Sequence, residues 1–184
     1  MIEISEKTFK EIETLKVTGS PEQMKGRALI QFNDSLTMGL GPDPLGKGFT
    51  KIADCMMNGD YYPDEIIRFE GRYRQEGRTL RVGDRLLQFA RFPFLPGYRS
   101  QTVAVVSVAE RTDCECKIGY YTTSRHFAKG WWQATLTQED DELVLLVQSA
   151  ARPQSLVYWL AIPIARFMQV RARRSAILRF ASWV

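Results

Sequence analysis

A glycine-rich segment over residues 41–47 nearly completes a phosphate-binding loop, the first of three places whose residue types could do chemistry. Such a loop cradles phosphate with backbone N–H groups, and the Ser or Thr after its lysine ligates Mg²⁺. Here Gly48 stands at that position, and Pro42 and Pro44 each remove a backbone donor. The segment therefore predicts a helix start, with Asp43 as the N-cap and Pro44 at the first helical position, and not a nucleotide site.

Cys114 and Cys116 have the spacing of half a metal site. One further cysteine and one histidine in the chain cannot readily complete it. On a strand, a spacing of two places both side chains on the same face, where Ile118 and Tyr120 follow them. Because a free cysteine packs like a small hydrophobic residue, we expect core packing, no metal ion and no cofactor.

His126, the single histidine, lies in a loop between two predicted strands. With Tyr120, Tyr121 and Arg91 it could form the polar mouth of a pocket and support cyclase or hydrolase chemistry. Nothing local supplies a base, an orienting carboxylate and a nucleophile together. We therefore assign no catalytic residue, and an enzyme is the less favoured interpretation.

Aromatic and aliphatic side chains fall on the apolar faces of the predicted elements, and they could line a cavity. A curved sheet around one helix tends to leave a hollow, which is where apolar ligands are held. The same residues could equally fill a core, and the sequence leaves both possibilities open. The candidate pocket-lining residues are Phe69, Tyr73, Ile118, Tyr120, Trp132, Trp159 and Phe167.

The elements that would position these residues follow from hydrophobic periodicity. Helical spacing predicts an amphipathic helix over residues 5–16 and a second helix between Asp43 and Asn58. Residues 28–32 have strand character, and residues 66–74 alternate apolar with charged side chains, which is typical of a half-buried antiparallel strand. Further strands are expected over residues 85–92, 101–109, 114–121, 131–137 and 142–150, with a turn over residues 93–97.

A long C-terminal helix is predicted from about residue 154 to 181, with a bend at Pro163. We expect Leu160, Ile164 and Phe167 to pack against the sheet, with Arg173 on the polar stripe. On that orientation, Phe167→Ala destabilises the protein far more than Arg173→Ala. Strands followed by one long helix give the fold class α+β.

Positive charge is concentrated at the end of the chain. The sequence has 25 basic and 21 acidic residues, and residues 152–184 contain six arginines and no acid. The helix arginines could bind an anionic surface such as lipid, nucleic acid or a phosphate, or they could lie against an acidic face of the same domain. The surface interpretation is the weaker, because the apolar face that a membrane needs is the one the sheet would cover. These arginines are Arg166, Arg171, Arg173, Arg174 and Arg179.

Cysteine content indicates the compartment. An odd number of cysteines, three, and no hydrophobic leader favour a reducing cytoplasm over a disulfide framework. The longest apolar run, residues 156–168, is short for a membrane span and contains Pro163 and Arg166. We therefore expect a cytoplasmic protein without a transmembrane segment.

Several local patterns between residues 39 and 180 resemble a family of bacterial and plant proteins known only as a domain of unknown function. That family belongs to the START-like superfamily, with lipid-transfer domains, polyketide cyclases and pollen-allergen proteins. The resemblance implies a helix-grip fold, in which a curved antiparallel sheet of about six to seven strands wraps a long C-terminal helix around an apolar pocket. It implies no established activity. The motifs are Gly39-x-Gly41, Arg81-Val82-Gly83, Tyr120-x-Thr122 before His126 and Gly130, and Arg152-Pro153 followed by Leu156, Leu160, Pro163, Arg166, Gln169, Arg171 and Arg174.

The sequence and the resemblance together predict a binding module for a hydrophobic or amphipathic small molecule. Residues 1–25 are expected to form a helical appendage, and residues 26–184 a single domain. A nucleic-acid partner is not favoured, and weak contact with a membrane surface stays open. The ligand, any reaction and the oligomeric state do not follow from these residues.

Overall fold

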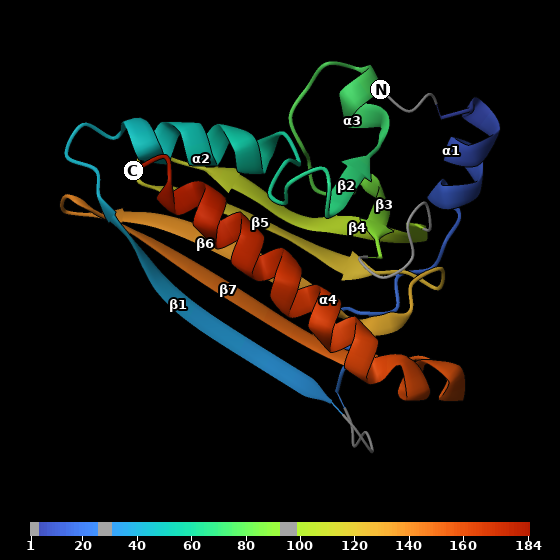
Figure 1. Ribbon diagram of the computed structural model, residues 1–184. Coiled ribbons are helices and arrows are strands. Elements are labelled where there is room, and N and C mark those ends of the chain that lie inside the picture. Colours follow the sequence, from blue (N-terminus) through green and yellow to red (C-terminus); the bar gives the residue numbers. More distant parts are fainter. Residues whose placement is uncertain (1–3, 26–30, 93–98) are drawn as a thin grey trace.

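Residues 4–25, 31–92 and 99–184, the part that the computed structural model describes, form a curved sheet of seven antiparallel strands around one long helix (Figure 1). The strand order is β1-β7-β6-β5-β4-β3-β2, so each consecutive pair from β2 to β7 is adjacent and β1 closes the far edge. The strands are β1 (Phe32–Pro42), β2 (Ile67–Glu70), β3 (Arg85–Arg91), β4 (Arg99–Arg111), β5 (Glu115–Thr122), β6 (Ala128–Glu139) and β7 (Glu142–Pro153).

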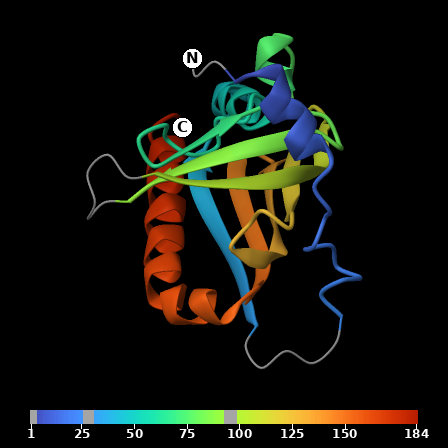
Figure 2. The ribbon, with the colours of Figure 1, turned by 90° about the vertical axis from the view of Figure 1, so that its right-hand side faces the viewer.

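Helices cover both faces of this sheet. On the concave face, α2 (Lys47–Met57) contacts β5 and β6, and α4 (Leu156–Ala181) contacts β1 and β7. The short helix α3 (Arg72–Gln75) follows β2, and α1 (Glu6–Glu13) lies against the other side of the sheet, near β3 and β4 (Figure 2). The predicted α+β helix-grip architecture is therefore confirmed.

Strand alternation divides the core into two clusters. The cross-strand pair Leu86–Ala104 belongs to the large core beneath α2 and α4, whereas the neighbouring pair Leu87–Val103 packs with Phe9 of α1. Successive side chains on a strand point to opposite faces, so one residue of offset separates the two clusters.

The first strand and the start of α2 differ from the prediction. Strand β1 runs from Phe32 to Pro42, while residues 28–30 of the predicted strand lie outside the described residues. Its side chains alternate between exposed and half-buried positions along this edge strand, which pairs with β7. Because many of its residues are polar, the hydrophobic pattern of the sequence does not reveal this alternation. Helix α2 begins after Gly46, but the Asp43 carboxylate still accepts a hydrogen bond from the Phe49 amide at 2.7 Å.

The predicted strand over residues 66–74 is too long. Strand β2 ends at Glu70, and the chain then turns into α3, which places Tyr73 in the core with its hydroxyl 3.4 Å from the Phe69 carbonyl oxygen. The later strands are confirmed to within a few residues. The predicted turn over residues 93–97 lies outside the described residues.

The extent of α4 is confirmed, but its predicted orientation is wrong. Leu160, Ile164 and Phe167 are 71%, 53% and 47% exposed, and the residues that pack on the sheet side are Ala172, Ala176 and Phe180. Phe167 and Ala176 are nine residues apart, about two and a half helical turns, so they face opposite ways. Small alanines let the helix approach the sheet closely, which large side chains on that face would prevent.

The first turns of α4 run at an angle to the rest of the helix (Figure 2). Pro163 lies in this region and cannot donate a hydrogen bond to the carbonyl of Trp159, which permits the predicted bend. Among the helices of residues 4–25, 31–92 and 99–184, none combines the length and apolarity that a membrane span requires.

Candidate functional site

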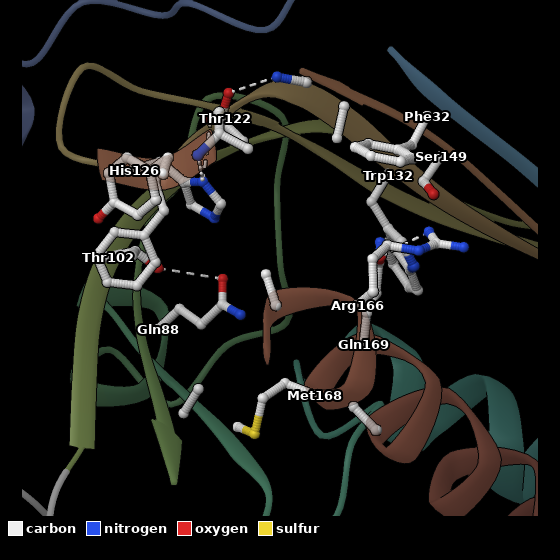
Figure 3. A pocket seen from close by; sticks show the side chains of 18 of the residues that line it. Phe32, Gln88, Thr102, Thr122, His126, Trp132, Ser149, Arg166, Met168 and Gln169 are labelled. Carbon is white, nitrogen blue, oxygen red and sulfur yellow. Dashed lines mark hydrogen bonds between the residues drawn. The ribbon is translucent and has the colours of Figure 1, made fainter. Parts of the chain in front are cut away.

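A cavity of about 350 Å³ lies between the concave face of the sheet and the N-terminal half of α4 (Figure 3). On the strands its walls come from alternating positions, such as Gln88 and Ala90 on β3 and Tyr120 and Thr122 on β5. On α4 they come from both sides of the bend, from Tyr158 and Ile162 through Ile164, Ala165, Arg166, Met168 and Gln169 to Ala172. The cavity is therefore the space that the bent helix leaves above the sheet.

Small side chains on the sheet make this space. Ala90, Ser100 and Gly130 lie beneath the first half of α4, together with Ala128 and Ala151. Gly130 cannot be enlarged, because a Cβ there would overlap the carbonyl oxygen of Ala150. Further along the same face, large side chains fill the gap between sheet and helix, so the cavity ends there.

An aromatic wall closes that end of the cavity. The rings of Tyr120 and Trp132 stack with their centroids 5.2 Å apart, and Tyr62 lies 5.9 Å from Trp132. Tyr61 packs edge-on behind them, between Trp132 and Phe180. Burial raises the pKa of Tyr62 and Tyr120 above the ordinary value, so both phenols are neutral and can donate a hydrogen bond.

Polar side chains interrupt the apolar lining on the β3–β4 side. Thr102 donates a hydrogen bond to the Gln88 side-chain oxygen at 3.4 Å, which leaves the Gln88 amide nitrogen without a partner among the described residues (Figure 3). On β7, Ser149 lines the cavity from the opposite side. These two groups can satisfy oxygens on a ligand.

His126 projects into the cavity from the β5–β6 loop (Figure 3). Its Nδ1 lies 3.1 Å from the backbone nitrogen of Ala128, which donates to it. The Gln154 side chain donates to the carbonyl oxygens of His126 at 2.8 Å and Thr123 at 3.1 Å, so the loop is fixed to the beginning of α4. Burial lowers the pKa of His126 to about 4, and the ring is therefore neutral near pH 7.

Arg166 brings a charged group to the helix side, but its charge is already paired. It forms an ion pair with Asp34 of β1 and donates to the Gln169 side-chain oxygen at 3.0 Å (Figure 3). The hydrogen bond from Arg166 holds the pKa of Asp34 below its ordinary value, so the carboxylate stays ionised. This pair joins the sheet edge to α4 and neutralises the charge of Arg166. Arg152 also lines the cavity, and its guanidinium donates to the Gln23 carbonyl oxygen at 2.7 Å.

The lining restricts the chemistry available. No carboxylate, lysine or cysteine side chain is among the described residues that line the cavity, so the neutral His126 has no acidic partner there. Within residues 4–25, 31–92 and 99–184, no group of three His, Cys, Asp or Glu side chains could hold a metal ion. Cys116 lies in the core instead, 3.9 Å from the carbonyl oxygen of Ala53.

Three of the sequence-predicted site residues line the cavity, namely Tyr120, Trp132 and His126. Three others lie in the core beside it, where Phe69 packs against Tyr120 with ring centroids 6.0 Å apart. The other two core residues are Tyr73 and Ile118.

The four remaining predicted residues lie away from the lining. Trp159 and Phe167 sit half-exposed on the outer side of α4, because the helix is rotated relative to the prediction. Arg91 is exposed at the end of β3, and Tyr121 follows Tyr120 by one residue, which turns it to the other face of the sheet.

Sequence reasoning missed most of the polar lining. Gln88, Thr102 and Ser149 occupy inward positions of predicted strands, so strand alternation together with their polarity could have identified them. Tyr62 lies in a loop and Phe32 at the start of an edge strand, and neither position carries a periodic signal.

Comparison with known proteins agrees with this architecture. The sequence profile of a family described as a domain of unknown function (DUF1990) matches residues 33–179. No curated protein sequence matches the chain significantly.

Similar solved structures include a hypothetical protein from Helicobacter pylori, with a TM-score of 0.51 and 13% identity over 91% of this chain and 95% of the other. The di-domain ARO/CYC StfQ from the steffimycin biosynthetic pathway has a TM-score of 0.50 and 12% identity over 83% of this chain and 49% of its own. Ara h 8.0201 has a TM-score of 0.50 and 14% identity over 83% of this chain and 95% of its own. At such identities the similarity shows the fold.

Proposed function

The chain belongs to the DUF1990 family, and we propose that it binds one small, mostly apolar and uncharged molecule in the cavity between the sheet and α4. The observation that supports this function is the cavity itself, about 350 Å³ of space beside a close-packed aromatic core. Protein interiors rarely leave such a volume unfilled unless something occupies it.

The charges around the cavity favour a neutral ligand. Arg166 is paired with Asp34, and His126 is neutral near pH 7. Arg152 is the lining cation without an ion pair among the described residues, and its guanidinium donates to the Gln23 carbonyl oxygen at 2.7 Å. A ligand carboxylate could therefore pair only with Arg152, so most of its desolvation would be uncompensated.

The polar groups favour a ligand with one or two oxygens. The Gln88 amide and the Ser149 hydroxyl face the cavity from opposite sides (Figure 3). A hydroxyl or carbonyl group at either end of an apolar body could accept or donate a hydrogen bond there.

A cyclase or hydrolase that uses the same cavity is the less supported function. General acid–base catalysis needs a group that titrates near the working pH, and the described lining offers His126 alone, with a pKa of about 4. Replacement of His126 by Ala should therefore abolish no activity on a screened cyclase substrate, and loss of turnover in this variant would support a catalytic role for His126.

Filling the cavity tests the proposal. Ala90 alternates with Gln88 on β3, while Phe89 packs on the α1 side, so Ala90→Phe adds a ring inside the cavity. Gln101→Phe adds the same ring to an exposed position of β4 and is the matched control.

Native mass spectrometry of gently purified protein, followed by titration with decanol, farnesol and a flavonoid, gives the readout. We expect the wild type and Gln101→Phe to retain or bind a ligand, and folded Ala90→Phe to bind at least tenfold more weakly. Equal binding by both variants would exclude the cavity. Absence of any bound mass and of any saturable signal in the wild type would contradict the function.

We also propose that the protein works in the cytoplasm, with residues 1–25 as an appendage on the domain 26–184. Cys55, Cys114 and Cys116 are free thiols, which a reducing compartment maintains. The small separate cluster between α1 and the sheet supports the appendage.

A further inference from the structure

The outer side of α4 exposes an unusual number of large apolar side chains. Trp159, Leu160 and Ile164 are 48%, 71% and 53% exposed, and Val170 and Leu178 are also exposed. At 3.6 residues per turn they all fall on one side of the helix, so they form one stripe along it, which we call the outer stripe. Figure 2 shows α4 along an edge of the molecule.

Two cations lie within this stripe. Arg171 follows Ile164 by seven residues, and Arg174 follows Arg171 by three, so both fall on the same side of the helix. Neither forms a hydrogen bond or an ion pair with the described residues, whereas Arg166 is paired with Asp34, and Arg179 donates to the backbone oxygen of Tyr61 at 2.8 Å. Residues 152–184 contain no acid that could neutralise them.

We propose that the outer stripe docks the protein on the surface of an anionic lipid bilayer. Apolar side chains next to unpaired arginines are typical of a helix that lies in the membrane interface, where the apolar groups enter the acyl boundary and the cations meet the headgroup phosphates. The sequence predicts that the sheet covers this apolar face, which would keep it from a membrane. The rotation of α4 removes that objection, because this face is exposed in the described part of the chain.

Charge complementarity favours a bilayer over a second copy of the chain. A two-fold interface pairs a surface with itself, which would bring Arg171 and Arg174 close to the same arginines of the partner without any acid between them. Nucleic acid would satisfy the arginines but would leave Leu160 and Ile164 in water.

The stripe also adjoins the cavity. Ile164 is half-exposed on the outer side and lines the cavity, next to Ala165 and Arg166. Docking would place this part of the helix against lipid, which is the phase from which an apolar ligand enters. Entry of a ligand from the bilayer into the cavity rests on the proposed function, but docking itself does not.

Vesicle co-sedimentation tests the docking surface on the whole chain. The probes are vesicles of phosphatidylcholine alone and of equal parts phosphatidylcholine and phosphatidylglycerol, each at low and high salt. We expect binding to the anionic vesicles only, weakened by salt. Since each cation near an anionic surface contributes about a fivefold factor, Arg171→Gln/Arg174→Gln should weaken binding roughly thirtyfold. Leu160→Ser/Ile164→Ser should weaken it roughly tenfold or more.

Matched controls remove the same chemistry elsewhere. Lys7→Gln/Lys10→Gln removes two exposed charges from α1, and Leu45→Ser/Val82→Ser removes two exposed apolar side chains from loops. Both should bind like the wild type. Circular dichroism and thermal melts verify that each variant is folded.

Three results would overturn the proposal. Absence of vesicle binding, or equal effects of the stripe and control variants, would show that the stripe is not a membrane surface. Light scattering that finds a dimer which Leu160→Ser/Ile164→Ser dissociates would assign the face to a second copy. Oligonucleotide binding that depends on Arg171 and Arg174 but not on Leu160 and Ile164 would assign it to nucleic acid. Failure of docking leaves cavity binding, measured without vesicles, unaffected.

Discussion

At position 126, burial and the backbone act on one imidazole in opposite directions. Burial lowers the pKa of His126 from 6.5 to about 4, and the Ala128 carbonyl oxygen, 3.1 Å from Nδ1, opposes this shift because it can accept a hydrogen bond from the protonated ring. In the unfolded chain the ring regains its ordinary pKa, so between these two values the unfolded state binds a proton that the folded state does not. The free energy of unfolding should therefore decrease as the pH falls from about 6.5 towards about 4.

Urea unfolding near neutral pH and near pH 5 measures this effect. His126→Gln removes the titrating ring, so the variant should lose less stability than the wild type over the same interval. The other ionisable groups are common to both proteins and cancel in the comparison. An identical loss in both would show that His126 is not held neutral by burial.

Asp34 controls the charge of the cavity wall. Asp34→Asn keeps the shape but leaves Arg166 without its ion pair, so the wall gains a positive charge. We expect the ratio of the affinities for decanoate and decanol to rise roughly tenfold, because the cation can now pair with a ligand carboxylate. Calorimetric titration of both ligands measures this ratio.

Asp64→Asn is the control for this change, since Asp64 is exposed and its ion pair with Arg68, at 3.9 Å, lies away from the lining. An unchanged affinity ratio in Asp34→Asn would contradict the role of the Asp34–Arg166 pair in setting the charge of the cavity wall.

Stability should also depend on pH through Asp34. Its folded-state pKa is lowered, so the contribution of the pair is complete above the unfolded pKa and is lost as the pH falls.

At the scale of elements, α4 divides into two parts with different partners. Its C-terminal half packs Ala172, Ala176 and Phe180 against the core, and its N-terminal half covers the cavity and exposes the outer stripe. The bend near Pro163 and the small residues of the sheet both increase the distance between helix and strands in the first half.

One substitution made at two positions tests this division. Phe180→Ala removes a fully buried ring and should lower the free energy of unfolding by about 3–5 kcal/mol. Phe167→Ala removes a half-exposed ring and should cost about 1 kcal/mol. Denaturant unfolding compares the two, and a larger cost at position 167 would mean that α4 is oriented as the sequence suggested.

At the scale of the whole molecule, cavity binding must stabilise the fold. A ligand that binds only the folded state, at one hundred times its Kd, adds about 2.7 kcal/mol to the free energy of unfolding. For a chain of this size, the Tm should rise by roughly 5–10 °C. Differential scanning fluorimetry with any ligand from the titration should show this rise in Gln101→Phe and not in Ala90→Phe.

Local patterns predicted most of the fold. Five strands from β3 to β7 and both long helices follow from periodicity and turn residues, because a half-buried strand alternates wherever it occurs. The errors lie where local patterns are ambiguous. Strand β1 is an edge strand rich in polar residues, and α3 interrupts an alternation that continues past Glu70.

The cavity could be predicted only in part. Alternation assigned Tyr120 and Trp132 to the inner face, and both line the cavity. It assigned Phe69 and Ile118 to the same face, yet they lie in the filled core, because a face does not specify where along it a gap occurs. That position depends on how small residues from different strands align with the bend of α4.

The sequence by itself determined the order of the elements, the faces of the strands and the concentration of arginine in the last helix. Only the tertiary structure decided which side of α4 meets the sheet. Apolar residues surround this helix, from Leu160 and Ile164 on one side to Met168 and Ala172 on the other, so its periodicity does not select a face. Close packing made the choice, because the alanine side approaches the strands and the bulkier side cannot.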